Sequence, residues 1–138
     1  AFKYDDKLII EEYIPGREIT VGIIEDRVLP IVEIVPKRKF FDFAAKYEKG
    51  MAEYIVPARI KKNIYQNCQA VGLKAHKALR ARSFSRVDII LNDKKGPVVL
   101  ELNTIPGFTE TSLLPKAAKA VSIQFEDLCL KILESASW

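Results

Sequence analysis

Short apolar runs separated by turn residues begin the chain and predict β-strands. The run KLIIEEYI at 7–14 suits a buried strand, and Pro15 and Gly16 after it mark a turn. Two further strands are predicted for REITVGII at 17–24 and VLPIVEIV at 28–35, joined by the short loop EDR. We therefore expect the chain to begin with successive strands of one sheet.

The middle of the chain changes from the strand pattern to a helical one. Residues 37–52 are rich in charge and show no clean period, so we expect a long loop that carries a helical turn. The stretch EYIV at 53–56 is typical of a short strand. From Arg59 to Leu79, apolar residues recur at every third or fourth position, which predicts a helix.

The last part of the chain predicts a hairpin followed by two helices. Two short strands surround a turn at 86–103, and helices are expected at 113–121 and 125–136. This order of strands, helix, strands and helices is typical of an α+β fold, a mostly antiparallel sheet with helices packed on one face. We expect one domain over residues 1–138, which is long enough to bury a core.

Composition and charge narrow the class of protein. With 49% apolar and 29% charged residues the chain should be globular, and no apolar run approaches the roughly 20 residues of a membrane span. The formal charge of +4 is spread along the chain, whereas nucleic-acid binders usually concentrate basic residues in a stripe. We therefore expect no membrane and no nucleic acid among its partners. A mild positive charge suits a phosphorylated or carboxylated small molecule.

The two cysteines indicate the cellular compartment of the protein. Cys68 and Cys129 lie far apart in helical patterns, so we expect reduced thiols. The N-terminal residues AFKYDDKLII also lack the pattern of a signal peptide. Both observations favour a cytoplasmic protein.

The predicted hairpin gathers polar side chains on one face. If Leu91 pairs with Val98 across the turn, Asp88 lies opposite Glu101. Directly opposed residues of an antiparallel pair point to the same side, and two like charges there destabilise a sheet. A bound cation would compensate, although a solvated face with scattered charges is the alternative.

The same register brings Arg86 opposite Asn103, beside the two carboxylates. Carboxylate and amide oxygens are hard ligands that suit Mg²⁺. A central Glu101 would bridge two ions, as in two-metal phosphoryl-transfer sites, and Arg86 would hold an anion. The chain has no glycine-rich phosphate loop. Either nucleotide binding uses other means, or part of the machinery lies outside this chain.

Six segments follow one another along the chain: EEYIPGREITVGI, EIVPK, FDFAAKY, EYIVPA, RVDIIL and LELNTIPGFTETSLLPKAA. In order and spacing they resemble the D-alanine–D-alanine ligase family. The resemblance covers essentially the whole chain and implies the later part of an ATP-grasp domain. It implies ATP-dependent ligation of two D-alanines through an acyl phosphate, for peptidoglycan precursors.

The resemblance also implies roles for the hairpin and the loop after it. Asp88, Glu101 and Asn103 match the ligands of two Mg²⁺ ions, with Mn²⁺ as a substitute ion. Arg86 and the backbone N–H of Gly107 match the groups that steady a developing oxyanion. Two residues match contacts to the carboxylate of the second D-alanine, Ser112 and Leu113.

Nucleotide contacts are implied in the first half of the chain. Glu11, Glu12, Tyr13 and Ile14 match the segment that holds adenine, and Glu18 matches the carboxylate that accepts the ribose hydroxyls. From the residues alone, these carboxylates would be charges on a strand edge.

A mobile loop over the phosphates is implied by Lys46 and Tyr47. Lys46 would meet the γ-phosphate, and Tyr47 favours the dipeptide over a depsipeptide. Without the resemblance this segment would be a solvated basic loop.

The resemblance places the first substrate domain and the first ATP-grasp segment outside this chain. We expect the missing N-terminal part as a partner, a homodimer as the assembly, and no activity from this fragment alone. Two alternatives remain open. One is another ATP-grasp carboxylate–amine ligase, and the other is a non-catalytic nucleotide-binding module.

Overall fold

The computed structural model describes residues 2–36 and 52–136. The strands are β1 Arg17–Ile24, β2 Arg27–Val28, β3 Val32–Pro36, β4 Ala52–Ile55, β5 Phe84–Asn92 and β6 Gly96–Asn103. The helices are α2 Lys62–Ala78, α3 Leu113–Lys119 and α4 Phe125–Ser135. The α+β prediction is confirmed, and the predicted helices and hairpin are found close to their expected bounds.

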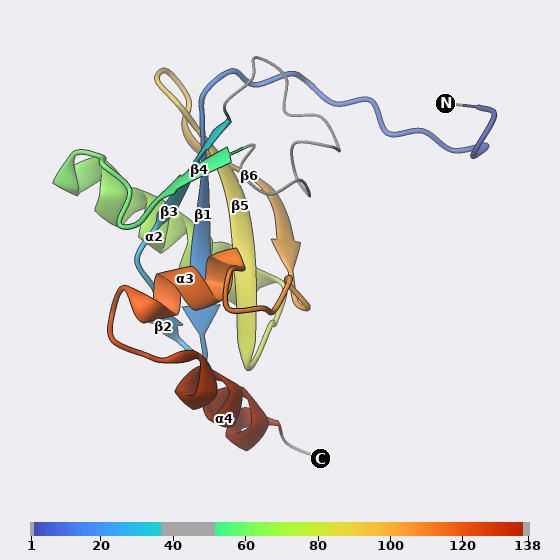
Figure 1. Cartoon of the computed structure of the whole chain (residues 1–138). Helices are drawn as coiled ribbons and strands as arrows, with labels where there is room; N and C mark the ends of the chain where they lie inside the picture. Colours follow the sequence, from blue (N-terminus) through green and yellow to red (C-terminus); the bar gives the residue numbers. More distant parts are fainter. Residues whose placement is uncertain (1, 37–51, 137–138) are drawn as a thin grey trace.

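One antiparallel sheet organises these elements (Figure 1). Its strand order is β4-β3-β1-β5-β6, and the short β2 pairs with the end of β1. Strands β1 and β5 therefore lie at the centre of the sheet, paired over the whole of β1. None of the helices in the described ranges is long and apolar enough to cross a lipid bilayer.

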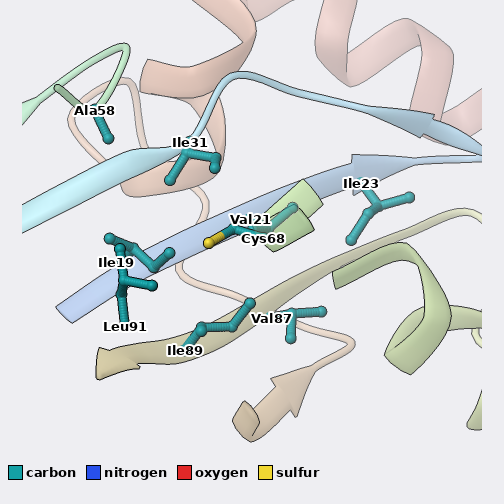
Figure 2. Close-up of a cluster of buried hydrophobic side chains, with 9 residues drawn as sticks. All are labelled: Ile19, Val21, Ile23, Ile31, Ala58, Cys68, Val87, Ile89 and Leu91. Atoms are coloured by element: carbon teal, nitrogen blue, oxygen red, sulfur yellow. The ribbon is translucent and has the colours of Figure 1, made fainter. Parts of the chain in front are cut away.

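Helix α2 covers one face of the sheet. Its apolar side meets the odd-numbered residues of β1 and β5, because alternate side chains of a strand point to opposite faces. Figure 2 shows the resulting core, in which side chains of β1 and β5 gather around Cys68 of α2. The buried members are Ile19, Val21, Ile23, Ile31, Ala58, Cys68, Val87, Ile89 and Leu91.

A polar contact fixes α2 against this face. His76 is 2% exposed and shares a 2.7 Å hydrogen bond with the buried hydroxyl of Ser85 on β5.

Cys68 is buried, and both Cys68 and Cys129 are free thiols. Burial raises the pKa of the Cys68 thiol.

Helices α3 and α4 pack on the opposite face, so the prediction that all helices share one face is wrong. Leu114 and Ala118 of α3 and Leu128 of α4 pack against Ile24 and Val32. The sequence explains this second core, because Ile23 and Ile24 are both buried at the end of β1 and so require cover on both faces. Figure 1 shows α3 lying across the sheet and α4 at one end of it.

Residues 7–14 do not form the predicted strand. They are extended but pair with none of the described strands, and Ile9 and Ile10 are 88% and 94% exposed. Figure 1 shows the N-terminal end of the chain leading away from the sheet. A strand is held by hydrogen bonds to a neighbouring strand, and this segment pairs with none of the strands of the described sheet.

The strand predicted at 28–35 is divided in two. Pro30 has no N–H to donate to a ladder, so the chain leaves the sheet between β2 and β3. The N–H of Leu29 instead donates to the carbonyl of Gly22, and Tyr65 of α2 accepts a 2.8 Å hydrogen bond from the N–H of Ile31. The loop predicted at 37–52 lies outside the described residues, except for Ala52, which begins β4.

Candidate functional site

The β5–β6 hairpin places two carboxylates opposite one another, as predicted. Asp88 pairs with Glu101, and Arg86 pairs with Asn103. The pairing assumed near the turn was wrong, because Leu91 pairs with Pro97 rather than with Val98.

A β-bulge explains why the pairs of Asp88 and Arg86 are predicted correctly although the pair of Leu91 is not. Ile89 pairs with Val99 while Asp88 pairs with Glu101, so Leu100 is an extra residue on β6. An extra residue shifts the register by one, which restores the predicted pairs at the open end of the hairpin. The bulge lies directly beside Glu101, at the edge of the polar cluster.

The polar side chains of the hairpin bind one another closely. The Arg86 guanidinium donates to both oxygens of Asp88, at 2.9 and 2.8 Å, and these two side chains are 19% and 14% exposed. The Asn103 amide donates to Glu101 at 3.0 Å and to Asp88 at 3.4 Å. Three potential ligand side chains therefore meet within the reach of one small cation.

Neighbouring carboxylates determine the charge state of Arg86 in this cluster. Burial by itself lowers the pKa of the Arg86 guanidinium, but the hydrogen bond and charge of Asp88, with Glu101 and Glu18 behind them, raise it overall. Arg86 thus remains a cation that partly neutralises three carboxylates. The described residues contain no group of three His, Cys, Asp or Glu side chains that could hold a metal, so the hairpin set relies on an amide as its third member.

A cavity of about 390 Å³ opens over these side chains. It lies on the sheet face opposite α2, between the hairpin, the start of α3 and the loop before α3. Its lining residues are Glu18, Ile34, Tyr54, Arg86, Asp88, Glu101, Asn103, Ile105, Pro106, Gly107 and Leu113. Seven of the predicted site residues are therefore brought together, while Ile34, Tyr54, Ile105 and Pro106 were not predicted.

Ser112 supports the cavity rather than lining it. Its hydroxyl accepts a 3.0 Å hydrogen bond from the N–H of Thr109 and lies 2.9 Å from the Thr109 hydroxyl. A Cβ built on Gly107 would lie 3.5 Å from the same Ser112 oxygen, so the two predicted residues are neighbours. Ser112 thereby shapes the loop that presents the Gly107 backbone.

Tyr54 forms a wall of the cavity and is held by α3. The Lys116 ammonium lies 5.2 Å from the centre of the Tyr54 ring, and it donates to the Thr111 carbonyl. Burial lowers the pKa of Lys116. The strand pattern around EYIV does not show that Tyr54 faces the site, because it does not reveal that β4 pairs with β3.

A second hollow of about 430 Å³ continues from the first. It is lined by Glu11, Glu12, Ile14, Glu18, Asp88, Val98, Val99, Leu100 and Glu101. Glu18, Asp88 and Glu101 line both hollows, so the cluster stands at their junction. Leu100 was not predicted here, because its place depends on the bulge.

The predicted adenine segment is fastened to the hairpin turn. The Lys95 ammonium binds the Glu12 carboxylate at 2.6 Å, and the Asn92 amide donates to the Pro15 carbonyl at 2.7 Å. Tyr13 is 86% exposed and lines a third hollow beside Arg17 and Glu33, which shares Glu18 with the other two.

The two loop residues predicted over the phosphates cannot be placed. Lys46 and Tyr47 lie outside the described residues. Their implied roles therefore remain predictions.

Comparison with known proteins agrees with this geometry. A family model described as "D-ala D-ala ligase C-terminus" matches residues 1–134. The chain belongs to the D-alanine–D-alanine ligase C-terminal family. This membership confirms the resemblance seen in the sequence motifs.

Relatives of this ligase family match nearly the whole chain. The D-alanine–D-alanine ligase of Geotalea uraniireducens is 46% identical over 137 residues, covering 99% of this chain and 44% of the relative. The ligase of Pelobacter propionicus is 47% identical with the same coverage. The chain thus spans about 44% of the length of these curated ligases.

Solved ligase structures share the fold. The Bacillus anthracis D-alanine–D-alanine ligase complexed with ATP has a TM-score of 0.82 at 36% identity, covering 97% of this chain and 44% of that one. The VanG D-Ala:D-Ser ligase of Enterococcus faecalis has a TM-score of 0.73 at 29% identity, covering 89% and 37%. Ligases with two different second substrates therefore resemble this chain.

Proposed function

We propose that this chain is the ATP- and Mg²⁺-binding part of a D-alanine–D-alanine ligase. The observation that carries the proposal is the cluster of Arg86, Asp88, Glu101 and Asn103 at the junction of two hollows. One hollow runs toward the segment expected to hold adenine, and the other runs toward the loop of Gly107. A phosphoryl group at the junction would therefore lie between nucleotide and acceptor.

The hairpin side chains fit Mg²⁺. Two carboxylates and an amide are too few for a cage made of protein alone, but Mg²⁺ keeps several waters and binds substrate phosphates as well. We propose that Asp88, Glu101 and Asn103 would hold two Mg²⁺ ions, or Mn²⁺ in their place. When bound there, the ions would neutralise phosphate charge and align the phosphates for transfer.

The second hollow would hold the nucleoside. We propose that the backbone of residues 11–14 meets the edge of adenine and that the Glu11 carboxylate accepts from its amino group. Glu12 is engaged by Lys95, so its share in this contact would be its backbone. Glu18 stands at the junction of the hollows, where a ribose would lie.

Residues around the first hollow would act on the amino acids. ATP would transfer its γ-phosphoryl group to the carboxylate of one D-alanine and leave as ADP. The amine of the second D-alanine would then attack the acyl carbon, and phosphate and a proton would leave as the peptide bond forms. During that attack, negative charge develops on the carbonyl oxygen, where Arg86 and the backbone N–H of Gly107 would donate hydrogen bonds. Ser112 and Leu113, at the start of α3, would position the second D-alanine through its carboxylate.

The remaining part of the enzyme would complete the site. The curated relatives are more than twice as long as this chain, and the chain carries no glycine-rich phosphate loop. We propose that the remainder supplies that loop and the first D-alanine site, while Lys46 and Tyr47 close over the phosphates. We expect the reaction in the cytoplasm, where ATP is made and thiols such as Cys68 stay reduced.

A second candidate is a related ligase with a different second substrate. The likeness to a D-Ala:D-Ser ligase favours this alternative. Tyr47 favours the D-alanyl-D-alanine product over a D-lactate ester. A non-catalytic module is less consistent with the structure, because Asp88 and Glu101 would then oppose one another without a function for their charge.

A product assay on the full-length protein tests the proposal. The protein is incubated with ATP, Mg²⁺ and D-alanine, alone or with D-serine or D-lactate, and products are identified by mass spectrometry. We expect D-alanyl-D-alanine as the main product and phosphate release that requires Mg²⁺. Predominance of D-alanyl-D-serine would favour the second candidate, and absence of Mg²⁺-dependent turnover with every amino acid would contradict the proposal.

A further inference from the structure

Thr20 carries an unpaired hydroxyl next to the proposed metal site. It lies in the middle of β1 and is 1% exposed, and its side-chain oxygen is the buried polar side-chain atom without a hydrogen-bond partner among the described residues. Buried polar groups are nearly always hydrogen-bonded, so an exception calls for a physical reason. A valine of the same shape would fill this position without the unpaired group.

The register brings Thr20 directly beside Asp88. These two residues pair across β1 and β5, so their side chains point to the same face, with Cβ atoms about 4.5–5.5 Å apart. On its other side Thr20 pairs with Val32, which is apolar. Glu18 lies two residues along β1, roughly 6.5–7 Å away. Asp88 is therefore the nearest acceptor that the hydroxyl could reach.

Arg86 now occupies both oxygens of Asp88. In the proposed reaction, Arg86 also donates to the charge that develops on the substrate, and one Asp88 oxygen binds the metal. An Arg86 side chain that turns toward the substrate would give up its two hydrogen bonds to Asp88. The carboxylate would need another donor to keep its orientation.

We propose that Thr20 is a positioning residue for Asp88. Its hydroxyl donates to the Asp88 carboxylate when Arg86 leaves, and it thereby orients that carboxylate toward Mg²⁺. The inference rests on the proposed function, because it takes Asp88 as a metal ligand. Groups that orient metal ligands in this way typically change metal affinity 10–100-fold when they are removed.

Two substitutions separate the hydroxyl from the shape of the side chain. Thr20→Val keeps the shape and removes the hydroxyl, and Thr20→Ser keeps the hydroxyl. In the full-length protein, Mg²⁺ affinity is measured from the rise of the unfolding midpoint Tm with Mg²⁺ concentration. We expect Thr20→Val to weaken Mg²⁺ binding about 10–100-fold and Thr20→Ser to bind within about threefold of the wild type.

Stability without the metal gives an independent readout. Removing an unpaired buried hydroxyl should leave the Tm of Thr20→Val without Mg²⁺ equal to that of the wild type or higher. If Thr20 had only a structural role, Thr20→Val would instead lower the Tm measured without Mg²⁺. In an Asp88→Asn background, Thr20→Val should have no further effect on Mg²⁺ affinity, because the group it orients is already removed.

The outcomes distinguish this inference from the proposed function. Wild-type Mg²⁺ affinity in Thr20→Val, with a wild type that binds Mg²⁺, would overturn the role of Thr20 alone. A lower Tm without Mg²⁺ together with unchanged affinity would also overturn it. A wild-type protein that Mg²⁺ does not stabilise would overturn both proposals.

Discussion

Arg86 shows how one side chain can be prepared for charge that appears only during a reaction. Its guanidinium is partly buried and held by Asp88 on the wall of the cavity. Arginine stays protonated in such a place, and the neighbouring carboxylates raise its pKa further. We therefore propose that Arg86 stabilises the transition state and does not contribute to nucleotide binding.

Replacing Arg86 should test that assignment. We expect Arg86→Ala in the full-length protein to lower kcat by about 10²–10³, the usual effect of losing one electrostatic donor, with ATP affinity nearly unchanged. Arg86→Lys should recover only part of the rate, because an ammonium lacks the planar fork of donors. Steady-state kinetics and ATP titration measure both quantities, and a large loss of ATP affinity at normal kcat would contradict the role.

His76 makes stability depend on pH in a defined direction. Burial lowers its pKa, although the charge of Asp26 and a hydrogen bond with the Arg82 backbone partly oppose this effect. The folded chain therefore keeps His76 neutral at pH values where the unfolded chain takes up a proton. That part of the stability is complete above the unfolded pKa of about 6.5 and is lost as the pH falls below it.

Denaturant unfolding between pH 7.5 and 5.5 measures this effect. We expect the free energy of unfolding to decrease toward pH 5.5, and His76→Gln to be less stable overall but flatter over this range. His76 is the only histidine of the chain, which makes the comparison direct. Equal slopes in the wild type and His76→Gln would show that His76 does not cause the dependence.

The β5–β6 hairpin shows which part of an element a sequence can predict. Alternation of apolar and polar residues on each arm identified the polar face, and the opposed carboxylates followed from it. The bulge at Leu100 could not be seen, because an extra residue changes the register without interrupting either arm. Residues whose place depends on the bulge or on distant strands, such as Leu100, Tyr54 and Thr20, were therefore missed.

The contact between β1 and α3 positions the residues proposed to bind the second D-alanine. Gly22 leaves room for Leu114, and a Cβ at Gly22 would lie 2.6 Å from the Leu114 Cδ1 atom. The same helix begins with Leu113 directly after Ser112, so its distance from the sheet sets where the second D-alanine would be held.

Gly22→Ala should move α3 away from the sheet. We expect a loss of about 1–3 kcal/mol in the free energy of unfolding, typical of overpacking, and a higher KM for the second D-alanine. Leu114→Ala provides the matched background, because it removes the atom that clashes. Gly22→Ala should then cost less stability than it does alone, and full additivity of the two substitutions would contradict this contact.

Across the chain as a whole, the sequence predicted the α+β class and the grouping of polar side chains on the hairpin better than the surroundings of the sheet. The apolar run at 7–14 was predicted to be a buried strand, and that prediction is wrong, because Ile9 and Ile10 are among the most exposed side chains described. A pattern shows that a segment favours burial, but the partner that buries it is not encoded in the segment itself. The same limit applies to the face on which each helix packs.

In the proposed function, the hairpin carboxylates hold the Mg²⁺ needed for phosphoryl transfer. Glu101 is the sharpest probe, because it lines both hollows and its side chain does not belong to either apolar core. Glu101→Gln keeps the size of the side chain and its hydrogen bonding while removing the charge. Its fold should therefore be preserved.

The most direct measurement is Mg²⁺-dependent D-alanyl-D-alanine synthesis by full-length Glu101→Gln beside the wild type. The account predicts that the variant unfolds within a few degrees of the wild type without Mg²⁺, gains little or no stability from Mg²⁺, and has no measurable turnover. Near-normal turnover at the Mg²⁺ concentration that the wild type requires would contradict the account.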